Sequence, residues 1–201
     1  MMNPTTVSSA GPATDEATLR VDLAACYRLL AHFGMDDLVY THISARLPGT
    51  RDQFLINPFG MLFSEVTAGS LVKVDHAGEL MAPSEHKVNP AGFVIHSAIH
   101  MAREDVVCVL HTHTEAGMAV ACLEDGLQPL SQWAMFVAGR VGYHDLEGIA
   151  VDLDERARLV RDMGTNAAMI LRNHGLLTVG GSVQEAFRLM YYFERACRVQ
   201  L

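Results

Sequence analysis

The sequence lacks the features that mark membrane, disulfide-rich and nucleic-acid-binding proteins. Its uncharged stretches are shorter than the roughly 20 apolar residues of a membrane span, and no basic segment followed by an apolar one opens the chain. Lys and Arg number 15 against 23 Asp and Glu, a formal net charge of −8, and no basic run offers itself to phosphates. The four cysteines form no CxxC pair, so neither a disulfide framework nor a thiolate zinc site is indicated. These absences favour a cytoplasmic protein with no membrane and no nucleic-acid partner.

The composition is that of a globular protein. Half of the 201 residues are hydrophobic and 19% are charged, which excludes a disordered or fibrous chain. The length favours one compact domain over separate cofactor and substrate domains. We expect a disordered N-terminal tail at residues 1–13, where the sequence is small, polar and without periodicity, and a single domain at 14–201.

Helical and extended patterns alternate along the chain. Apolar residues spaced three and four apart, with capping signals, predict helices at 14–33, 90–102, 114–123, 155–164 and 182–201. Short apolar or β-branched runs predict strands at 38–47, 53–57, 71–75, 105–110, 167–173 and 176–180. Residues 124–147 resemble a loop. Because tight turns join several strands, the predicted fold class is α/β, a three-layer α/β/α domain with a central mixed, mainly antiparallel sheet.

Ten histidines raise the question of a metal. The predicted strand at 105–110 leads directly into His111 and His113, whose side chains would share one face with Cα atoms roughly 6.5–7 Å apart. His174 is the best candidate for a third ligand, because it lies in a tight turn where Gly175 relaxes the backbone constraint. Three neutral imidazoles leave coordination positions open, as in a catalytic metal site.

The other histidines leave an alternative open. His96 and His100 are spaced i, i+4 on a predicted helix and could also share a metal, although we expect a mainly structural role for them. The remaining five are isolated in sequence and are expected at the surface or in loops: His32, His42, His76, His86 and His144.

Five motifs occur in order: THISAR, INPFGMLFSEV, AGFVIHSAIHMAREDVVCVLHTHT, GYHDLEGI and ILRNHGLLTVGGSVQEAF. Through them residues 18–200 resemble the class II aldolase/adducin family, its adducin-like branch more than its sugar-phosphate aldolases. The resemblance implies an α/β/α fold and a four-fold symmetric homotetramer. It also implies a divalent metal, typically zinc, held by His111, His113 and His174, the residues that the spacing selects.

The resemblance also implies a chemistry. In the aldolase members, the metal acts as a Lewis acid that stabilises an enediolate, a carboxylate serves as acid/base, and a tyrosine of the neighbouring subunit donates a proton. Tyr143 occupies the place of that tyrosine, and packing in an interface loop is its alternative role.

Two departures separate this sequence from the aldolases. Gly92 stands where alignment without gaps expects the acid/base glutamate, and Glu85 is a substitute only if Pro83-Ser84-Glu85 is that motif displaced. Thr41-His42 replaces the Gly-Asn pair of the sugar-phosphate enzymes, which argues against a phosphorylated substrate.

Three functions remain open. The first is a metal-dependent lyase, of aldolase or decarboxylase type, acting on a small non-phosphorylated hydroxy or keto acid or an aromatic carbonyl compound, with zinc and, as alternatives, iron or manganese. The second is a mononuclear non-haem iron oxygenase that uses the same three histidines. The third is a non-catalytic adducin-like assembly module, which Gly92 favours and the retained histidines oppose. In each case we expect a homo-oligomer with the 131–148 loop at a subunit boundary.

Overall fold

The computed structural model describes residues 15–148 and 155–201, except for the side chains of 90–93. The predicted tail at 1–13 therefore lies outside the described residues. The described chain contains five α-helices: α1 (Glu16–His32), α2 (Pro90–Ala102), α3 (Glu115–Ala121), α4 (Glu155–Met163) and α5 (Val183–Gln200). Seven strands accompany them: β1 (His42–Arg46), β2 (Gln53–Ile56), β3 (Val72–Asp75), β4 (Cys108–Thr112), β5 (Val141–His144), β6 (Ala168–Leu171) and β7 (Gly175–Gly180).

The seven strands form one mixed sheet in the order β3-β2-β1-β4-β7-β6-β5. Neighbouring strands are antiparallel, except that β5 and β6 are parallel. The predicted fold class, with its mainly antiparallel sheet, is confirmed.

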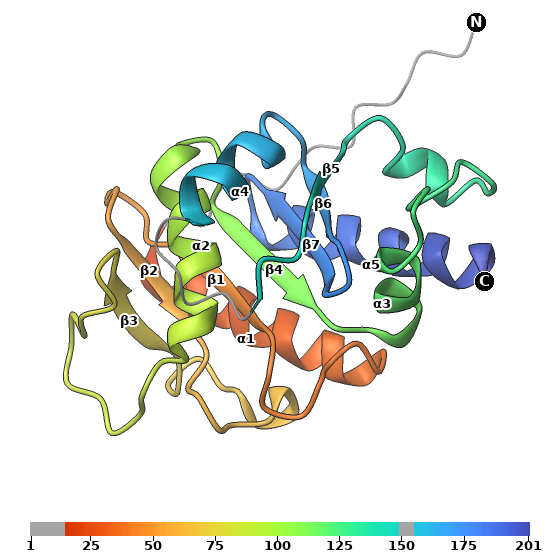
Figure 1. Ribbon diagram of the computed structural model, residues 1–201. Coiled ribbons are helices and arrows are strands. Elements are labelled where there is room, and N and C mark those ends of the chain that lie inside the picture. Colours follow the sequence, from red (N-terminus) through yellow and green to blue (C-terminus); the bar gives the residue numbers. More distant parts are fainter. Residues whose placement is uncertain (1–14, 149–154) are drawn as a thin grey trace, which may run out of the picture.

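Helices cover both faces of the sheet (Figure 1). One face packs against α1, α3 and α5 through the larger apolar core, and the other packs against α2 and α4 through a smaller one. Short polar caps begin the longest helices, as the sequence predicted for α5. The Asp15 carboxylate accepts from the Thr18 amide at 2.7 Å, and the Ser182 hydroxyl accepts from the Glu185 amide at 3.1 Å. No described helix is long and apolar enough to cross a membrane.

The prediction of a loop throughout 124–147 is wrong at its end, because Val141–His144 form β5 beside β6. Gly142 obscured this strand, since glycine weakens any strand pattern. Its place has a steric reason: a Cβ at Gly142 would lie 2.6 Å from the Asp162 carbonyl oxygen of α4. The helix therefore approaches the strand as closely as only glycine permits.

The strand predicted at 38–47 begins four residues late. Leu38 and Thr41 have left-handed backbone φ angles of 48° and 64°, which strands do not contain. The extended conformation therefore starts at His42. The strand predicted at 105–110 is likewise displaced to Cys108–Thr112, so His111 belongs to β4 and His113 follows its last residue.

Candidate metal centre

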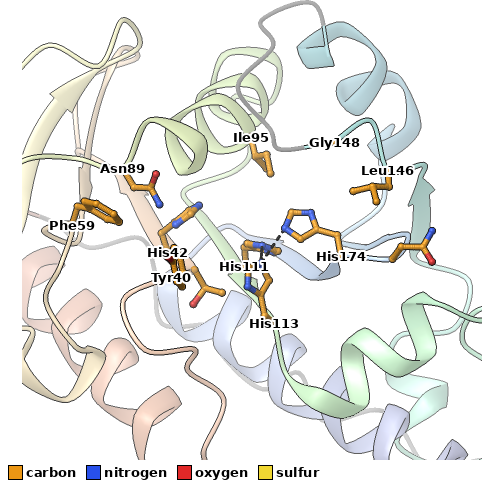
Figure 2. Close-up of a pocket in the computed structure, with 12 residues that line it drawn as sticks. Tyr40, His42, Phe59, Asn89, Ile95, His111, His113, Leu146, Gly148 and His174 are labelled. Carbon is orange, nitrogen blue, oxygen red and sulfur yellow. Dashed lines mark hydrogen bonds between the residues drawn. The ribbon is translucent and has the colours of Figure 1, made fainter.

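The structure brings together the three histidines that the sequence selected as ligands (Figure 2). The Nε2 atoms of His111 and His113 are 2.8 Å apart, and those of His113 and His174 are 3.0 Å apart. Within the described part of the chain, this is the one group of three or more His, Cys, Asp or Glu residues whose ligand atoms converge.

A close approach of two turns produces this convergence. His174 occupies the β6–β7 turn, where Asn173 has a left-handed φ of 57°, a conformation that asparagine tolerates better than most residues. At the next residue, Gly175, a Cβ would collide with the Thr112 carbonyl oxygen and lie 3.2 Å from the His113 ring. The glycine therefore lets the turn lie directly against the end of β4.

The contacts behind the rings leave their Nε2 lone pairs free for a cation. His111 Nδ1 lies 2.9 Å from the Leu176 carbonyl oxygen, which can only accept, so Nδ1 carries the proton and Nε2 does not. His113 Nδ1 lies 3.0 Å from the Asp37 carboxylate, and the same reasoning applies. Two bare nitrogens at 2.8 Å repel each other unless a cation lies between them, so the donor set fits a metal.

Burial lowers the pKa of two of the three imidazoles, those of His111 and His174, and so favours the neutral form that binds metals. Burial, followed by the neighbouring His174 and His113, holds the pKa of His111 well below its ordinary value. Burial also lowers the pKa of His174 to about 4, with His113 adding to the effect.

The three histidines open onto a cavity of about 430 Å³. Its other walls are mostly apolar, and no Lys, Arg, Asp or Glu is among the described residues that line it. The remaining lining residues are Tyr40, Thr41, His42, Phe59, Asn89, Ile95, Leu146, Gly148 and Asn173. A site of this kind suits a small molecule whose body is uncharged.

Tyr143 lies on the opposite face of the sheet from His111. One row of residues in register crosses the sheet from β4 to β5: His111, Leu177, Met169 and Gly142. Residues in register share a face and successive residues alternate. The side chain of Tyr143, which follows Gly142, therefore projects from the other face of the sheet.

The Tyr143 ring packs within its own chain and is not among the residues that line the cavity. The Arg172 guanidinium lies over it, 4.9 Å from the ring centroid. The ring also packs against the larger apolar core and against Gly126, where a Cβ would collide with it. Tyr143 therefore does not line the cavity of its own chain. A role in a neighbouring subunit, as the family resemblance implies, stays a prediction.

Glu85 is also separate from the three histidines. It is exposed between β3 and α2 and lines a different hollow together with Arg20 and Lys73. Gly92 lies in α2, among the residues whose side-chain surroundings are outside the description. The structure thus brings together the predicted metal ligands but neither predicted acid/base residue.

His96 and His100 both face one hydroxyl group. His96 Nδ1 and His100 Nε2 both lie against the Ser44 hydroxyl, at 2.7 and 2.8 Å, in a buried hydrogen-bonded chain. This arrangement agrees with the mainly structural role expected for them.

Two residues of the site escaped the sequence analysis. His42 was expected at the surface or in a loop but is 6% exposed and lines the cavity, and its position next to His111 depends on the β1–β4 register. Asp37 lies in the turn before His42 and contacts His113, 76 residues further along the chain. No local sequence pattern predicts such a contact. His144 is buried as well, between Asp162 and Glu155, contrary to expectation.

Comparison with known proteins supports the family resemblance. Residues 21–201 match the model of the class II aldolase and adducin N-terminal domain. The chain is 57% identical over 182 residues to a Pseudomonas aeruginosa protein provisionally named as an aldolase class 2 protein, covering 90% of this chain and 70% of that one. It is 46% identical over 189 residues to alpha-adducin of Rattus norvegicus, covering 92% of this chain and 26% of the adducin.

Solved structures agree with these matches. An aldolase II superfamily protein from Pseudomonas syringae superimposes with a TM-score of 0.90 at 53% identity, covering 94% of this chain and 75% of that one. L-fuculose 1-phosphate aldolase from Glaciozyma antarctica superimposes with a TM-score of 0.84 at 33% identity, covering 92% of this chain and 72% of that one. The chain therefore belongs to the class II aldolase and adducin family, and its identity with alpha-adducin exceeds its identity with this sugar-phosphate aldolase.

Proposed function

We propose that this chain is a divalent-metal-dependent lyase, of aldolase or decarboxylase type, acting on a small non-phosphorylated hydroxy, keto or aromatic carbonyl compound. Proteins of the class II aldolase family are generally metal-dependent lyases. The observation that carries the proposal is the set of three imidazoles with Nε2 atoms 2.8 and 3.0 Å apart, two of them backed by acceptors that hold the proton on Nδ1.

The residues of the chain divide the work as follows. His111, His113 and His174 would hold the metal, with zinc as the first choice for the lyase; manganese is the alternative for the lyase, and iron is the metal of the alternative oxygenase. When bound, the metal supplies Lewis-acid stabilisation of the negative charge that develops on a substrate oxygen. Leu176 and Asp37 orient the first two rings through Nδ1, and the apolar walls exclude water, which strengthens the electrostatic interactions within the site.

The charge of the lining supports a substrate without a phosphate group. No described lining residue is Lys or Arg, the side chains that ordinarily pair with a phosphate. The L-fuculose 1-phosphate aldolase relative is named for a phosphorylated substrate. This chain would therefore share the type of reaction with that aldolase but act on a substrate without a phosphate group.

The proton donor belongs to the proposal as well. No carboxylate is among the described lining residues, so we assign the role first to Tyr143 of a neighbouring subunit in a cytoplasmic homotetramer, and second to Glu85. The boundary between subunits would include the 131–148 loop. A molar mass near 22 kDa in light scattering at micromolar concentration would contradict this assembly.

Metal analysis tests the proposal most directly. Protein purified without added metal should contain close to one zinc or manganese ion per chain, and His113→Ala should lose it, because two protein ligands bind far more weakly than three. Iron would favour the oxygenase. A protein that holds no metal after incubation with zinc would favour the assembly module, which the 46% identity with alpha-adducin keeps in view.

A further inference from the structure

Two of the three ligand rings are held from behind by an acceptor. His111 Nδ1 donates to the Leu176 carbonyl oxygen at 2.9 Å. His113 Nδ1 donates to the Asp37 carboxylate at 3.0 Å. The third ring, that of His174, directs Nε2 at His113, and its Nδ1 has no hydrogen-bond partner among the described residues. A histidine that binds a metal almost always donates its second ring N–H to a carboxylate, a carbonyl oxygen or a water molecule, so an acceptor for His174 is expected close to its ring.

A small hollow of about 10 Å³ lies behind His174. Four residues line both this hollow and the large cavity, and so form the wall between the two spaces: Ile95, Leu146, Gly148 and His174. Leu146 and Gly148 lie on the side of the His174 ring that is away from His113 (Figure 2). The volume of the hollow is just enough for one water molecule. Such a water could bond to His174 from behind without occupying the cavity.

Three carboxylate residues line the hollow, and their contacts single out one of them as the acceptor. The side chain of Asp145 is 90% exposed. Both oxygens of Glu147 accept from the Arg158 guanidinium. Glu155 is buried, and its Oε1 lies 3.3 Å from His144 Nε2, while its Oε2 has no hydrogen-bond partner in the described part of the chain. Glu155 therefore offers the hollow a buried carboxylate oxygen that no other side chain occupies.

A chain of hydrogen bonds fixes the Glu155 carboxylate. His144 Nδ1 lies 2.8 Å from the Asp162 carboxylate, which only accepts, so this nitrogen carries a proton. A bare Nε2 would repel Glu155 Oε1, so a second proton lies between these two atoms. The chain turns Oε1 toward His144 and leaves Oε2 for the hollow. After burial and His113, His144 also contributes to lowering the pKa of His174 to about 4, as expected of groups on either side of one small hollow.

We propose that Glu155 is a positioning residue for His174, and that it acts through one water molecule in the hollow. The water accepts the proton that His174 carries on Nδ1 and donates to Glu155 Oε2. This bond holds the His174 ring with Nε2 toward the other two ligands and raises the basicity of that nitrogen. The inference rests on the proposed function, because it takes His174 to be a metal ligand. It gives each of the three rings an acceptor of its own.

Zinc affinity tests the inference, and the hollow itself supplies a matched control. Glu155→Gln keeps the shape of the side chain but removes the negative charge that attracts the water proton. We expect its zinc affinity, measured by competition with a chelator, to fall about tenfold, the lower end of the range for loss of such a partner. Glu147→Gln makes the same change of charge in the same hollow, at a carboxylate already bonded to Arg158. Its zinc affinity should stay within about threefold of the wild type, and equal losses in both variants would contradict the inference.

Imidazole NMR separates positioning from a merely structural role. In the zinc-loaded protein with ¹⁵N-labelled histidine, the Nδ1–H of His174 should exchange with solvent about tenfold faster in Glu155→Gln than in the wild type, as loss of one hydrogen bond allows. The Nδ1–H of His111, which bonds the Leu176 carbonyl oxygen, should keep its rate. Asp162→Asn should weaken zinc binding in the wild type and add nothing in Glu155→Gln, because both changes act through the same chain. An unchanged exchange rate at His174 would contradict the inference.

The outcomes separate this inference from the proposed function. Equal zinc affinity of the wild type and Glu155→Gln would overturn the role of Glu155 and leave a metal-dependent lyase standing. Failure of the wild type to bind zinc would overturn the proposed function and this inference together. If Glu155→Gln does not fold, a crystal structure of the zinc-loaded wild type decides. We expect one ordered water within about 3.2 Å of both His174 Nδ1 and Glu155 Oε2, and a His174 Nδ1 bonded to any other group would overturn the inference.

Discussion

The two faces of the central sheet are built for different purposes, although the same strands form both. Ile43 and Ala45 of β1 face the apolar core under α1 and α5, whereas His42 and Ser44, their alternate neighbours, face α2. In β4, Leu110 belongs to that core while His111 joins the candidate metal centre. Because side chains alternate along a strand, one short sequence supplies both a close-packed face and a polar face.

The comparison shows where the polar groups can be tolerated. The α2 and α4 face has an apolar cluster toward β6 and β7. Its buried polar residues lie at β1 and β4, beside the cavity, and at β5, where His144 pairs with Asp162 and Glu155. The larger core on the other face supplies packing that offsets the cost of burying histidines. The face that binds and the face that stabilises should therefore respond differently to substitution.

Tyr143→Phe provides the largest expected effect and the strongest challenge to this division. Tyr143 lies on the face away from the cavity. Within one chain it therefore belongs to the stabilising face and has no part in the chemistry of the metal centre. If it donates a proton in a neighbouring subunit, kcat should fall about 10²- to 10⁴-fold with metal content and assembly unchanged. A loss below about tenfold would exclude that role, and Glu85→Gln, measured in parallel, tests the second candidate by the same criterion.

Leu110→Ala should break the stabilising face alone. Leu110 is fully buried, and truncation of such a side chain costs roughly 2–5 kcal/mol of unfolding free energy, through lost burial and the cavity left behind. Urea denaturation measures this loss. Zinc affinity of the folded variant should change less than about threefold, and a large loss of affinity would show that the two faces are coupled.

Asp37→Ala should weaken the binding face without affecting the core. The Asp37 carboxylate lies 3.0 Å from His113 Nδ1, and loss of such a partner typically costs about 10- to 100-fold in metal affinity. Competition with a zinc chelator gives the affinity. Asp36→Ala, a change at the adjacent carboxylate, is the control, and equal losses in both variants would contradict a specific role for Asp37.

The smallest expected effect is a pH dependence of the unfolding free energy, which should come from the buried histidines on the α2 face of the sheet. Burial, with smaller contributions from Arg46 and His76, lowers the pKa of His100 to about 3, and burial also lowers the pKa of His96. Below about pH 6.5 these two histidines bind protons in the unfolded chain, whereas in the folded protein they stay neutral because they are buried. Stability is therefore complete above about pH 6.5 and falls below it at up to about 1.4 kcal/mol per pH unit for each buried imidazole. For His100 this fall extends to about pH 3.

Urea titrations of the metal-free protein at pH 7.0 and 5.5 measure this dependence. His100→Gln should reduce the loss of unfolding free energy between pH 7.0 and 5.5 by the part that comes from protonation of one histidine in the unfolded chain. An unchanged dependence would mean that His100 is protonated in the folded state.

The sequence predicted most of the helices and strands, since their periodicity and caps are local. It also selected the three histidines that the structure brings together: the HxH spacing concerns neighbouring residues, and the Asn-His-Gly turn is visible in three letters. It failed where a pattern was interrupted for tertiary reasons. Gly142 concealed β5 because α4 passes too close for a side chain, and Leu38 and Thr41 delayed β1 because their backbone is left-handed.

By itself, the sequence determined the type of fold, the family and the three histidines, because alternation, spacing and motif order are all written in consecutive residues. Only the tertiary structure decided what surrounds those histidines. Asp37 reaches His113 across 76 residues, and His42 stands beside His111 through strand register. Tyr143 points away from the cavity because Gly142, and not Tyr143, lies in the row of β5 that shares a face with His111. Such relations depend on how separate strands align, and no local pattern of side chains specifies that alignment.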